Sequence, residues 1–247
     1  MKQDVYKETS MSSQTAQIIA RLHELGDSRI AAHSQGFFKT GPGEYGEGDI
    51  FLGIRVPTIR KCVREFQSVM LEETLELLES PFHEARLLAL LLMAARYAAA
   101  CTSREKEALY GAYLEHTGHI NNWDLVDCSA EHIVGAHLFG RERSPIYLLA
   151  RSKSLWERRI AIISTFHFIK KGDFADTLAI AKILLHDRED LIHKATGWML
   201  REVGKRDICA EKEFLDRHCR EMPRTMLRYA IERFPEEERQ SYLCGNR

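Results

Sequence analysis

The segment Leu155-Trp156-Glu157-Arg158-Arg159-Ile160-Ala161-Ile162 resembles several other helix-like segments of the same chain. Four more can be laid over it, namely Phe82–Ala89, Trp123–Ala130, Asp190–Gly197 and Arg224–Ile231. Helical patterns such as Glu105–His116 and Ala175–His186 lie between the copies, and strand signals are scarce. A helix pair that recurs every ~35–45 residues is typical of HEAT-like or armadillo-like repeats. We therefore predict an all-α fold, a curved solenoid of HEAT-like helix pairs that forms one domain over residues 1–247.

Composition limits the function classes. The chain has 247 residues and is 45% hydrophobic, enough for one large core or two modest ones. Residues 1–17 are polar and lack an apolar signal-peptide core, so we expect a loosely attached N-terminus and no secretory signal. The longest apolar run, Leu87–Cys101, is too short to span a bilayer and predicts a buried helix. These features favour a cytoplasmic protein with no membrane partner.

Cysteines and glycines give two further exclusions. The six cysteines are scattered, with no CxxC pair and no His/Cys ligand spacing, which fits reduced thiols and argues against a zinc site. The glycine-rich segment Gly36–Gly53 lacks the GKS or GKT ending of a phosphate loop and carries two glutamates at its centre. We expect a lid or connector between N-terminal helices there, and neither a metal nor a cofactor.

The repeat alignment places five charged residues in one column: Arg86, Asp127, Arg159, Lys194 and Arg228. Equivalent positions of a solenoid line one concave surface, so the cations would form a basic stripe suited to a phosphate backbone. The net charge of −1 permits such a partner without requiring it, and residues 141–247 are modestly basic. The one carboxylate would weaken backbone binding, so another task is expected for it.

Two tryptophans lie beside this column. Trp123 precedes Asp127 by one helical turn, and Trp198 follows Lys194 by one turn. We therefore expect the tryptophans, Asp127 and Arg159 to converge on one groove. Each tryptophan could instead be core packing, and Arg159 could pair with Glu157 or with an acid on a neighbouring helix.

Four motifs resemble the AlkD-type family of DNA alkylation repair glycosylases, from about Phe37 to the C-terminus. They are Phe51-Leu52-Gly53-Ile54-Arg55-Val56-Pro57, Asn122-Trp123-Asp124-Leu125-Val126-Asp127, Arg159-Ile160-Ala161-Ile162 and Lys194-Ala195-Thr196-Gly197-Trp198-Met199-Leu200-Arg201-Glu202. The resemblance implies that Asp127 is the catalytic carboxylate, that Trp123 and Trp198 flank the damaged nucleotide, and that Arg159 lies beside them.

The chain also departs from the family pattern. A tyrosine expected near the start of the fold falls at Phe37, which keeps a lesion-binding position but lacks the hydroxyl. A lysine expected two turns after the arginine falls at His167, which weakens one backbone contact at neutral pH. The Thr40–Asp49 insertion is longer than in close relatives. DNA-backbone contacts are expected from Arg86, His167, Lys194, Arg201 and Arg228.

The resemblance implies a monofunctional glycosylase that excises 3-methyladenine or 7-methylguanine type bases from double-stranded DNA and leaves an abasic site. A carboxylate can stabilise the positive charge that develops on the sugar. We expect a monomer, and we expect Arg159→Ala to weaken DNA binding and flatten its salt dependence. The alternative is a non-catalytic HEAT-like solenoid that binds damaged or branched DNA or a protein partner.

Overall fold

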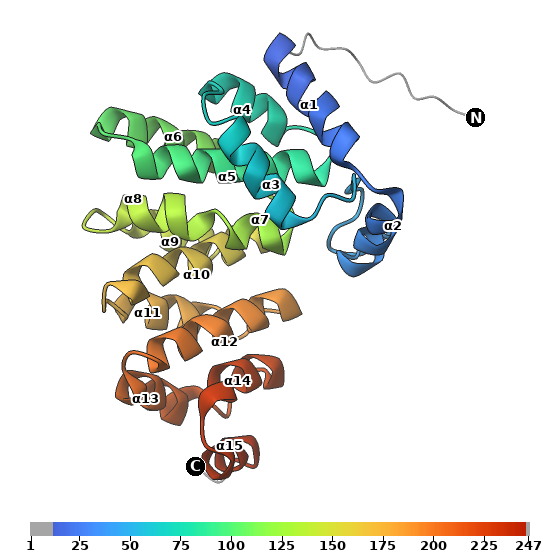
Figure 1. Ribbon diagram of the computed structural model, residues 1–247. Coiled ribbons are helices and arrows are strands. Elements are labelled where there is room, and N and C mark those ends of the chain that lie inside the picture. Colours follow the sequence, from blue (N-terminus) through green and yellow to red (C-terminus); the bar gives the residue numbers. More distant parts are fainter. Residues whose placement is uncertain (1–11, 246–247) are drawn as a thin grey trace. The chain divides into compact units, whose positions relative to one another are not determined.

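The computed structural model describes residues 12–245, which are helical and contain no β-strand (Figure 1). One isolated bridge joins Ile50 and Phe82. The chain divides into two compact units. Unit 1 comprises the described residues up to Ala99 together with Gly118–Asn122, and unit 2 comprises Ala100–Thr117 and the described residues from Trp123 onward. The predicted all-α class is confirmed, and the single domain over residues 1–247 stays a prediction.

Unit 1 is built around one long buried helix. Its helices are α1 (Ser13–Leu25), α2 (Ser28–Phe37), α3 (Val56–Glu65), α4 (Leu71–Leu78) and α5 (His83–Ala99). The apolar run that begins at Leu87 lies in α5, where Leu88, Leu90 and Met93 are fully buried, so the predicted buried helix is confirmed.

The expected loose N-terminus is described only in part. Residues 1–11 lie outside the described part of the chain. From Ser13 on, the segment is helical, because the Ser12 hydroxyl accepts a hydrogen bond from the Thr15 amide at 3.1 Å and caps α1. Glu76 accepts a further hydrogen bond from the Thr15 hydroxyl at 2.6 Å, which ties α1 to α4.

A single side chain of α5 holds the end of the glycine-rich connector. Glu84 of α5 accepts hydrogen bonds from the backbone amides of Leu52, Gly53 and Ile54 at 2.8–3.1 Å. Gly53 has φ +83°, and a Cβ atom there would lie 2.1 Å from the carbonyl oxygen of Asp27. Only glycine fits this backbone conformation and this close approach. The segment is therefore a fixed connector between α2 and α3.

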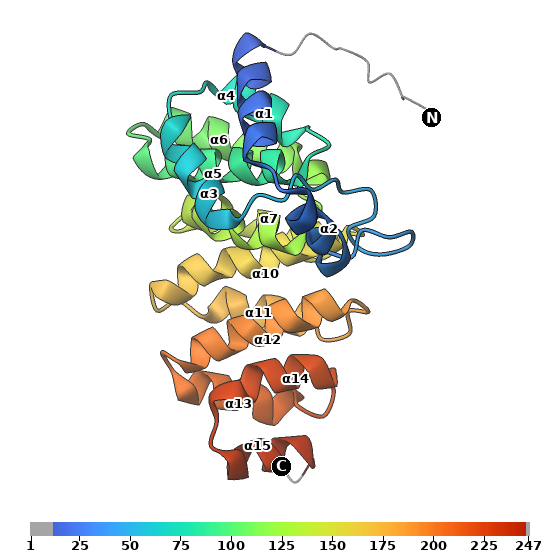
Figure 2. The same cartoon turned by 45° about the vertical axis from the view of Figure 1, so that its right-hand side comes forward.

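Unit 2 contains the remaining helices. They are α6 (Ser103–Glu115), α7 (Trp123–Asp127), the π-helix η2 (Glu131–Gly135), α8 (Ala136–Leu138), α9 (Ser144–Leu149), α10 (Leu155–Lys170), α11 (Ala175–Ile183), α12 (Asp190–Gly204), α13 (Ile208–His218), α14 (Arg224–Ala230), the 3-10 turn η3 (Ile231–Arg233) and α15 (Glu236–Leu243). Another 3-10 turn, η1 (Thr117–His119), lies where the chain passes between the units. Within unit 2, α10, α12 and α14 follow one another as layers (Figures 1 and 2).

Two glycines show that these layers share one register. A Cβ atom on Gly135 would lie 2.9 Å from the Cβ atom of His167, and one on Gly197 would lie 2.6 Å from that of Tyr229. In both pairs the partner is 32 residues further along the chain. Each glycine therefore lets the next layer approach its backbone at an equivalent place. The contacts repeat in the way that stacked repeats require.

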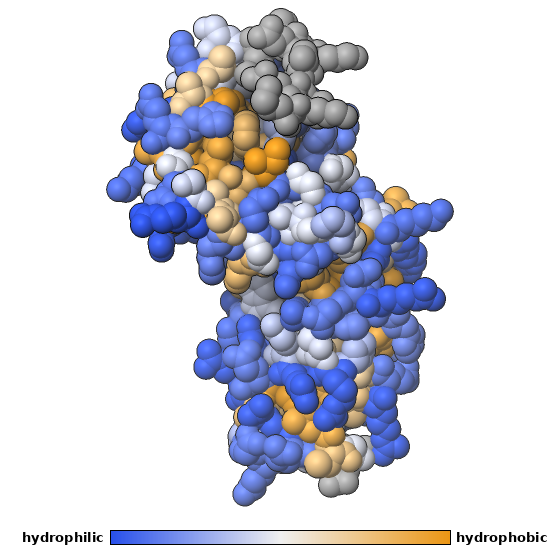
Figure 3. Space-filling model, turned by 90° about the vertical axis from the view of Figure 1, so that its right-hand side faces the viewer, coloured by the Kyte–Doolittle hydropathy of each residue, from blue (hydrophilic) through white to orange (hydrophobic). Residues whose placement is uncertain are grey.

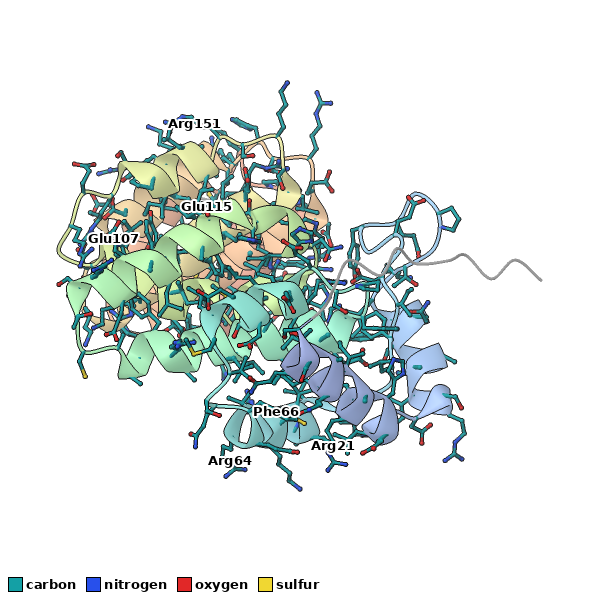
Figure 4. The ribbon with its side chains drawn as sticks, turned by 90° about the horizontal axis from the view of Figure 1, so that it is seen from above. Arg21, Arg64, Phe66, Glu107, Glu115 and Arg151 are labelled. Atoms are coloured by element: carbon teal, nitrogen blue, oxygen red, sulfur yellow. The ribbon has the colours of Figure 1, made fainter. Side chains whose placement is uncertain are left out.

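Polar side chains cover much of one face of the molecule. The face of the molecule in Figure 3 is mostly hydrophilic, with hydrophobic side chains gathered in a few patches. On unit 1, Arg21 and Glu65 form an ion pair at 3.6 Å between α1 and α3, and Arg64 extends from α3 into solvent (Figure 4). A search of residues 12–245 finds no helix with the length and apolarity needed to cross a membrane.

Candidate active site

The helix that carries Trp123 and Asp127 is short. The helix-like segment Trp123–Ala130 of the repeat alignment forms a continuous α-helix only over α7, with Trp123 as its first residue and Asp127 as its last. Leu125 and Val126 are fully buried and anchor the inner side of α7 in the core of unit 2. Trp123 and Asp127 are half-buried one turn apart, so the predicted shared face is confirmed.

Arg159 on α10 binds the Asp127 carboxylate through two parallel hydrogen bonds. Its Nε atom donates to Asp127 Oδ1 and its Nη2 atom to Asp127 Oδ2, each at 2.8 Å. The third nitrogen, Nη1, donates to the carbonyl oxygen of Leu191 in the first turn of α12 at 2.6 Å. The guanidinium of Arg159 on α10 thus links α7 and α12. The fork geometry fixes the orientation of the carboxylate plane.

The two partners differ in exposure. The Arg159 side chain is 6% exposed, whereas the Asp127 side chain is 20% exposed. Burial raises the pKa of the Asp127 carboxyl, and the charge and hydrogen bonds of Arg159 oppose that shift. Both Asp127 oxygens accept hydrogen bonds from the guanidinium, so the geometry fits the ionised carboxylate. Part of this anion remains open to an approaching group.

A neighbouring pair shows what a structural ion pair looks like in this fold. Arg158 donates from Nε to Asp187 Oδ2 at 2.5 Å and from Nη2 to Oδ1 at 3.2 Å. The Asp187 side chain is only 6% exposed and also accepts a hydrogen bond from the amide of Glu189 at 2.9 Å. Asp127 is more open and has a tryptophan one turn away on its own helix, which distinguishes it as the candidate reactive carboxylate.

Trp198 lies further along the same layers. It follows Leu191 by seven residues on α12, two turns or about 10 Å along the helix axis. The facing residue on α10 is Phe166, whose ring centroid lies 5.8 Å from that of the indole. Trp198 Nε1 donates to Glu202 Oε1 at 3.2 Å. The structure therefore joins Trp123, Asp127 and Arg159 locally and places Trp198 farther along α12.

The predicted backbone cations of unit 2 have different surroundings. Lys194 ion-pairs with Asp190 at 2.7 Å and is 40% exposed, whereas Arg201 ion-pairs with Glu232 and is 16% exposed. Arg228 is exposed. His167 is half-buried beside the Phe139 ring, and burial lowers its pKa, so its imidazole is neutral at pH 7. Among these four, Arg228 has the most accessible charge for a phosphate.

The charged column needs two corrections. Arg86 is 4% exposed, donates to the carbonyl oxygen of Ser80 at 2.8 Å and ion-pairs with Asp49, so it is a core residue of unit 1 and no part of an exposed stripe. The other four members keep the predicted alignment, since Asp127, Arg159, Lys194 and Arg228 are each the fifth residue of α7, α10, α12 and α14. Asp127 is likewise no lone anion, because Arg159 neutralises it.

Phe37 belongs to unit 1. It is the last residue of α2, and its side chain is among the exposed large hydrophobic ones, with 57% of the residue accessible. Its ring lies 6.4 Å from that of His33 and 5.1 Å from that of Phe38. An exposed aromatic residue at a helix end fits a binding position better than a core position.

Sequence reasoning missed three groups. The Leu191 carbonyl carries no side-chain signal, and Asp49 meets Arg86 across 37 residues of chain. Glu202 follows Trp198 by four residues, a spacing that does predict a contact on one helix face. Within residues 12–245, no cluster of three or more His, Cys, Asp or Glu side chains is arranged to hold a metal ion.

Comparison with known proteins identifies the class. The family described as DNA alkylation repair enzyme matches residues 18–234, most of the chain. The chain belongs to this family. A solved structure described as a predicted DNA alkylation repair enzyme from Enterococcus faecalis is similar in fold, with a TM-score of 0.65 and 16% sequence identity. The match covers 85% of this chain and 97% of that one. No curated protein matches the sequence significantly.

Proposed function

We propose that the protein is a DNA glycosylase that hydrolyses the N-glycosidic bond of cationic alkylated purines, of the 3-methyladenine and 7-methylguanine type, in duplex DNA. The observation that carries this proposal is the partly exposed Asp127 carboxylate, which is bound by the Arg159 guanidinium and lies one turn from Trp123 on the same helix. Family membership supports DNA alkylation repair as the setting of that chemistry.

The role of Asp127 follows from the charge of the transition state. As the bond between C1′ and the base breaks, its electron pair leaves with the base, and positive charge grows on the deoxyribose. A fixed carboxylate stabilises this charge without having to reorganise. A water molecule then adds to C1′ and loses a proton to solvent, leaving an abasic site. Arg159 acts as a positioning residue, because it fixes the carboxylate plane.

An alkylated purine suits a site with a single carboxylate. Such a base is already a cation, so it departs as a neutral molecule and needs no general acid. The indole faces of Trp123 and Trp198 attract cations by about 0.5–2 kcal/mol. This attraction favours alkylated over normal nucleotides without reading base edges. The resemblance further implies work from the sugar-phosphate side, with no protein pocket around the base.

The reaction is proposed to stop at the abasic site. A lyase step needs an amine that forms a Schiff base with the sugar. Among the described residues, the group that binds Asp127 is the guanidinium of Arg159, which cannot serve as this amine. The chemistry assigned to Asp127 also uses no metal ion or cofactor.

We also propose that the layers of unit 2 are HEAT-like repeats whose concave face takes the DNA duplex, with the protein acting as a monomer. The shared 32-residue offset at Gly135 and Gly197 supports this repeat assignment. Arg228, Lys194, Arg201 and His167 are the proposed contacts to the DNA backbone.

The test is an excision assay on methylated duplex DNA. The wild-type protein is expected to release free 7-methylguanine or 3-methyladenine, detected by chromatography, and to leave one alkali-labile abasic site per base released. Borohydride should trap no covalent protein–DNA complex. Tight binding to the methylated duplex without base release would contradict the glycosylase and favour a non-catalytic DNA-binding protein.

A further inference from the structure

Glu202 is a buried carboxylate to which the proposed chemistry gives no role. Only 6% of the residue is exposed, on the face of α12 that carries Trp198 one turn earlier. It accepts the indole N–H of Trp198 at 3.2 Å. The same oxygen, Oε1, ion-pairs with Lys205 at 2.5 Å, and the other oxygen, Oε2, ion-pairs with Arg206 at 3.2 Å. The indole is thus hydrogen-bonded to a fixed anion.

Neighbouring cations stabilise the ionised form of Glu202. Burial opposes ionisation of Glu202, but its ion pairs with Lys205 and Arg206 hold the pKa of this carboxyl below its ordinary value. Arg206 also donates from Nη1 to the backbone carbonyl of Glu202 at 2.9 Å. The Phe166 ring from α10 packs against the indole with an interplanar angle of 58°. Trp198 is therefore restrained at its N–H by Glu202 and at its ring by Phe166.

We propose that Glu202 positions Trp198 and strengthens its attraction for a cationic base. This inference rests on the proposed function. A hydrogen bond to an ionised acceptor polarises its donor, so the N–H bond to Glu202 shifts electron density toward the indole ring. A ring richer in electrons attracts a cation more strongly. Glu202 thereby contributes to selectivity for alkylated purines without touching the DNA.

Glu131 provides a matched control. Its side chain is 8% exposed, as is that of Glu202, and it also ion-pairs with a lysine, Lys170, at 2.5 Å. No tryptophan N–H is bonded to Glu131 among the contacts of the described residues. Glu202→Gln and Glu131→Gln therefore remove similar buried charges, and only the first removes a charge that faces an indole.

Two measurements test the inference on the full-length protein. The first is the affinity for duplexes that contain 7-methylguanine or its neutral isostere, 7-methyl-7-deazaguanine. Glu202→Gln is expected to lower the preference for the cationic base about three- to tenfold, whereas Glu131→Gln leaves it unchanged. The second is tryptophan fluorescence. Glu202→Gln should shift the emission, and the shift should vanish in a Trp198→Phe background.

Glu202→Asp guards against a folding failure of the glutamine variant. It keeps the charge but shortens the side chain away from the indole, so it should show the same loss of preference. If both Glu202 variants keep the wild-type preference for the cationic base and the wild type still releases 7-methylguanine, the inference is wrong and the proposed function is unaffected. Failure of the wild type to release 7-methylguanine would instead contradict the proposed function, and this inference with it.

Discussion

Arg159 and Asp127, 32 residues apart, are joined by two hydrogen bonds of 2.8 Å, and the aspartate remains the more exposed partner. This asymmetry matters because it leaves part of the Asp127 carboxylate accessible, whereas the Asp187 side chain beside Arg158 is only 6% exposed. The two hydrogen bonds from Arg159 fix the orientation of the Asp127 carboxylate, and part of the carboxylate remains accessible to solvent. Preorganisation of this kind is what electrostatic catalysis requires.

Arg159→Ala is expected to destabilise the fold and leave the salt dependence of DNA binding unchanged. The guanidinium is buried and neutralised by Asp127, so it releases no counterions from DNA, contrary to the expectation from the sequence. Loss of one partner from a largely buried pair costs about 2–4 kcal/mol. Urea unfolding and DNA titrations at several salt concentrations measure the two effects. A reduced salt slope would mean that Arg159 contacts phosphate.

Arg228→Gln is expected to weaken binding to any duplex and to lower the salt slope by about 0.9, the value for one phosphate contact. The reason is that its charge is the most accessible among the proposed backbone cations of unit 2. Arg151→Gln is the control, since Arg151 (labelled in Figure 4) is also exposed, donates to the carbonyl of Tyr147 and is not one of the proposed DNA-backbone contacts. Equal slopes for both variants would argue against the proposed DNA-binding face.

Gly197→Ala is expected to destabilise the protein by about 3 kcal/mol, because the new methyl group would lie 2.4 Å from the carbonyl oxygen of Met226. Gly111 on α6 has no atom within 4 Å of such a methyl group, so Gly111→Ala should be neutral or stabilising by about 1 kcal/mol. Chemical denaturation measures both. Equal effects of the two substitutions would contradict the close packing of α12 on α14.

Glu211 on α13 makes stability depend on pH. Burial raises its pKa from 4.5 to about 8, and its Oε1 atom has no hydrogen-bond partner within the described residues. The native state therefore holds the proton more tightly than the unfolded chain does. Its contribution to stability is complete below pH 4.5 and is lost as the pH rises through about 8.

Glu211→Gln removes this titration. Between about pH 5 and pH 9, the free energy of unfolding of the variant should therefore fall by about 2–5 kcal/mol less than that of the wild type. Urea unfolding at both pH values gives the difference. Parallel pH profiles for the two proteins would show that Glu211 is ionised in the native state.

The sequence was informative where local spacing determines geometry. The spacing from Trp123 to Asp127 predicts one helix face, and the apolar run from Leu87 predicts a buried helix; both are found. These features depend on residues within one or two turns, whose relative positions the helix itself fixes.

The contacts between layers were harder to predict than the repeat itself. The alignment placed Arg159, Lys194 and Arg228 at equivalent positions, and each is the fifth residue of its helix in the structure. It did not predict that Arg159 donates to the carbonyl oxygen of Leu191, three residues before Lys194. Long charged side chains reach across a turn, so equivalent positions on neighbouring helices need not touch each other.

Partners distant in the chain could not be predicted from residue type. Arg86 looks like the other cations of the column until Asp49 is brought against it from the connector. Both are then buried, with His83 and Asn122 also bonded to Asp49 at 3.0 and 3.2 Å. Nothing in the local sequence of Arg86 indicates this network.

The most direct test of the central claim compares Asp127→Asn with Asp187→Asn in excision of 7-methylguanine from methylated duplex DNA. Each variant replaces the aspartate of a two-pronged pair with an arginine of α10, so both should lose stability. Asp127→Asn is expected to slow excision at least about 10²-fold while it keeps most of the DNA affinity, and Asp187→Asn is expected to excise at close to the wild-type rate. Undiminished excision by Asp127→Asn would contradict the assignment of Asp127 as the catalytic carboxylate.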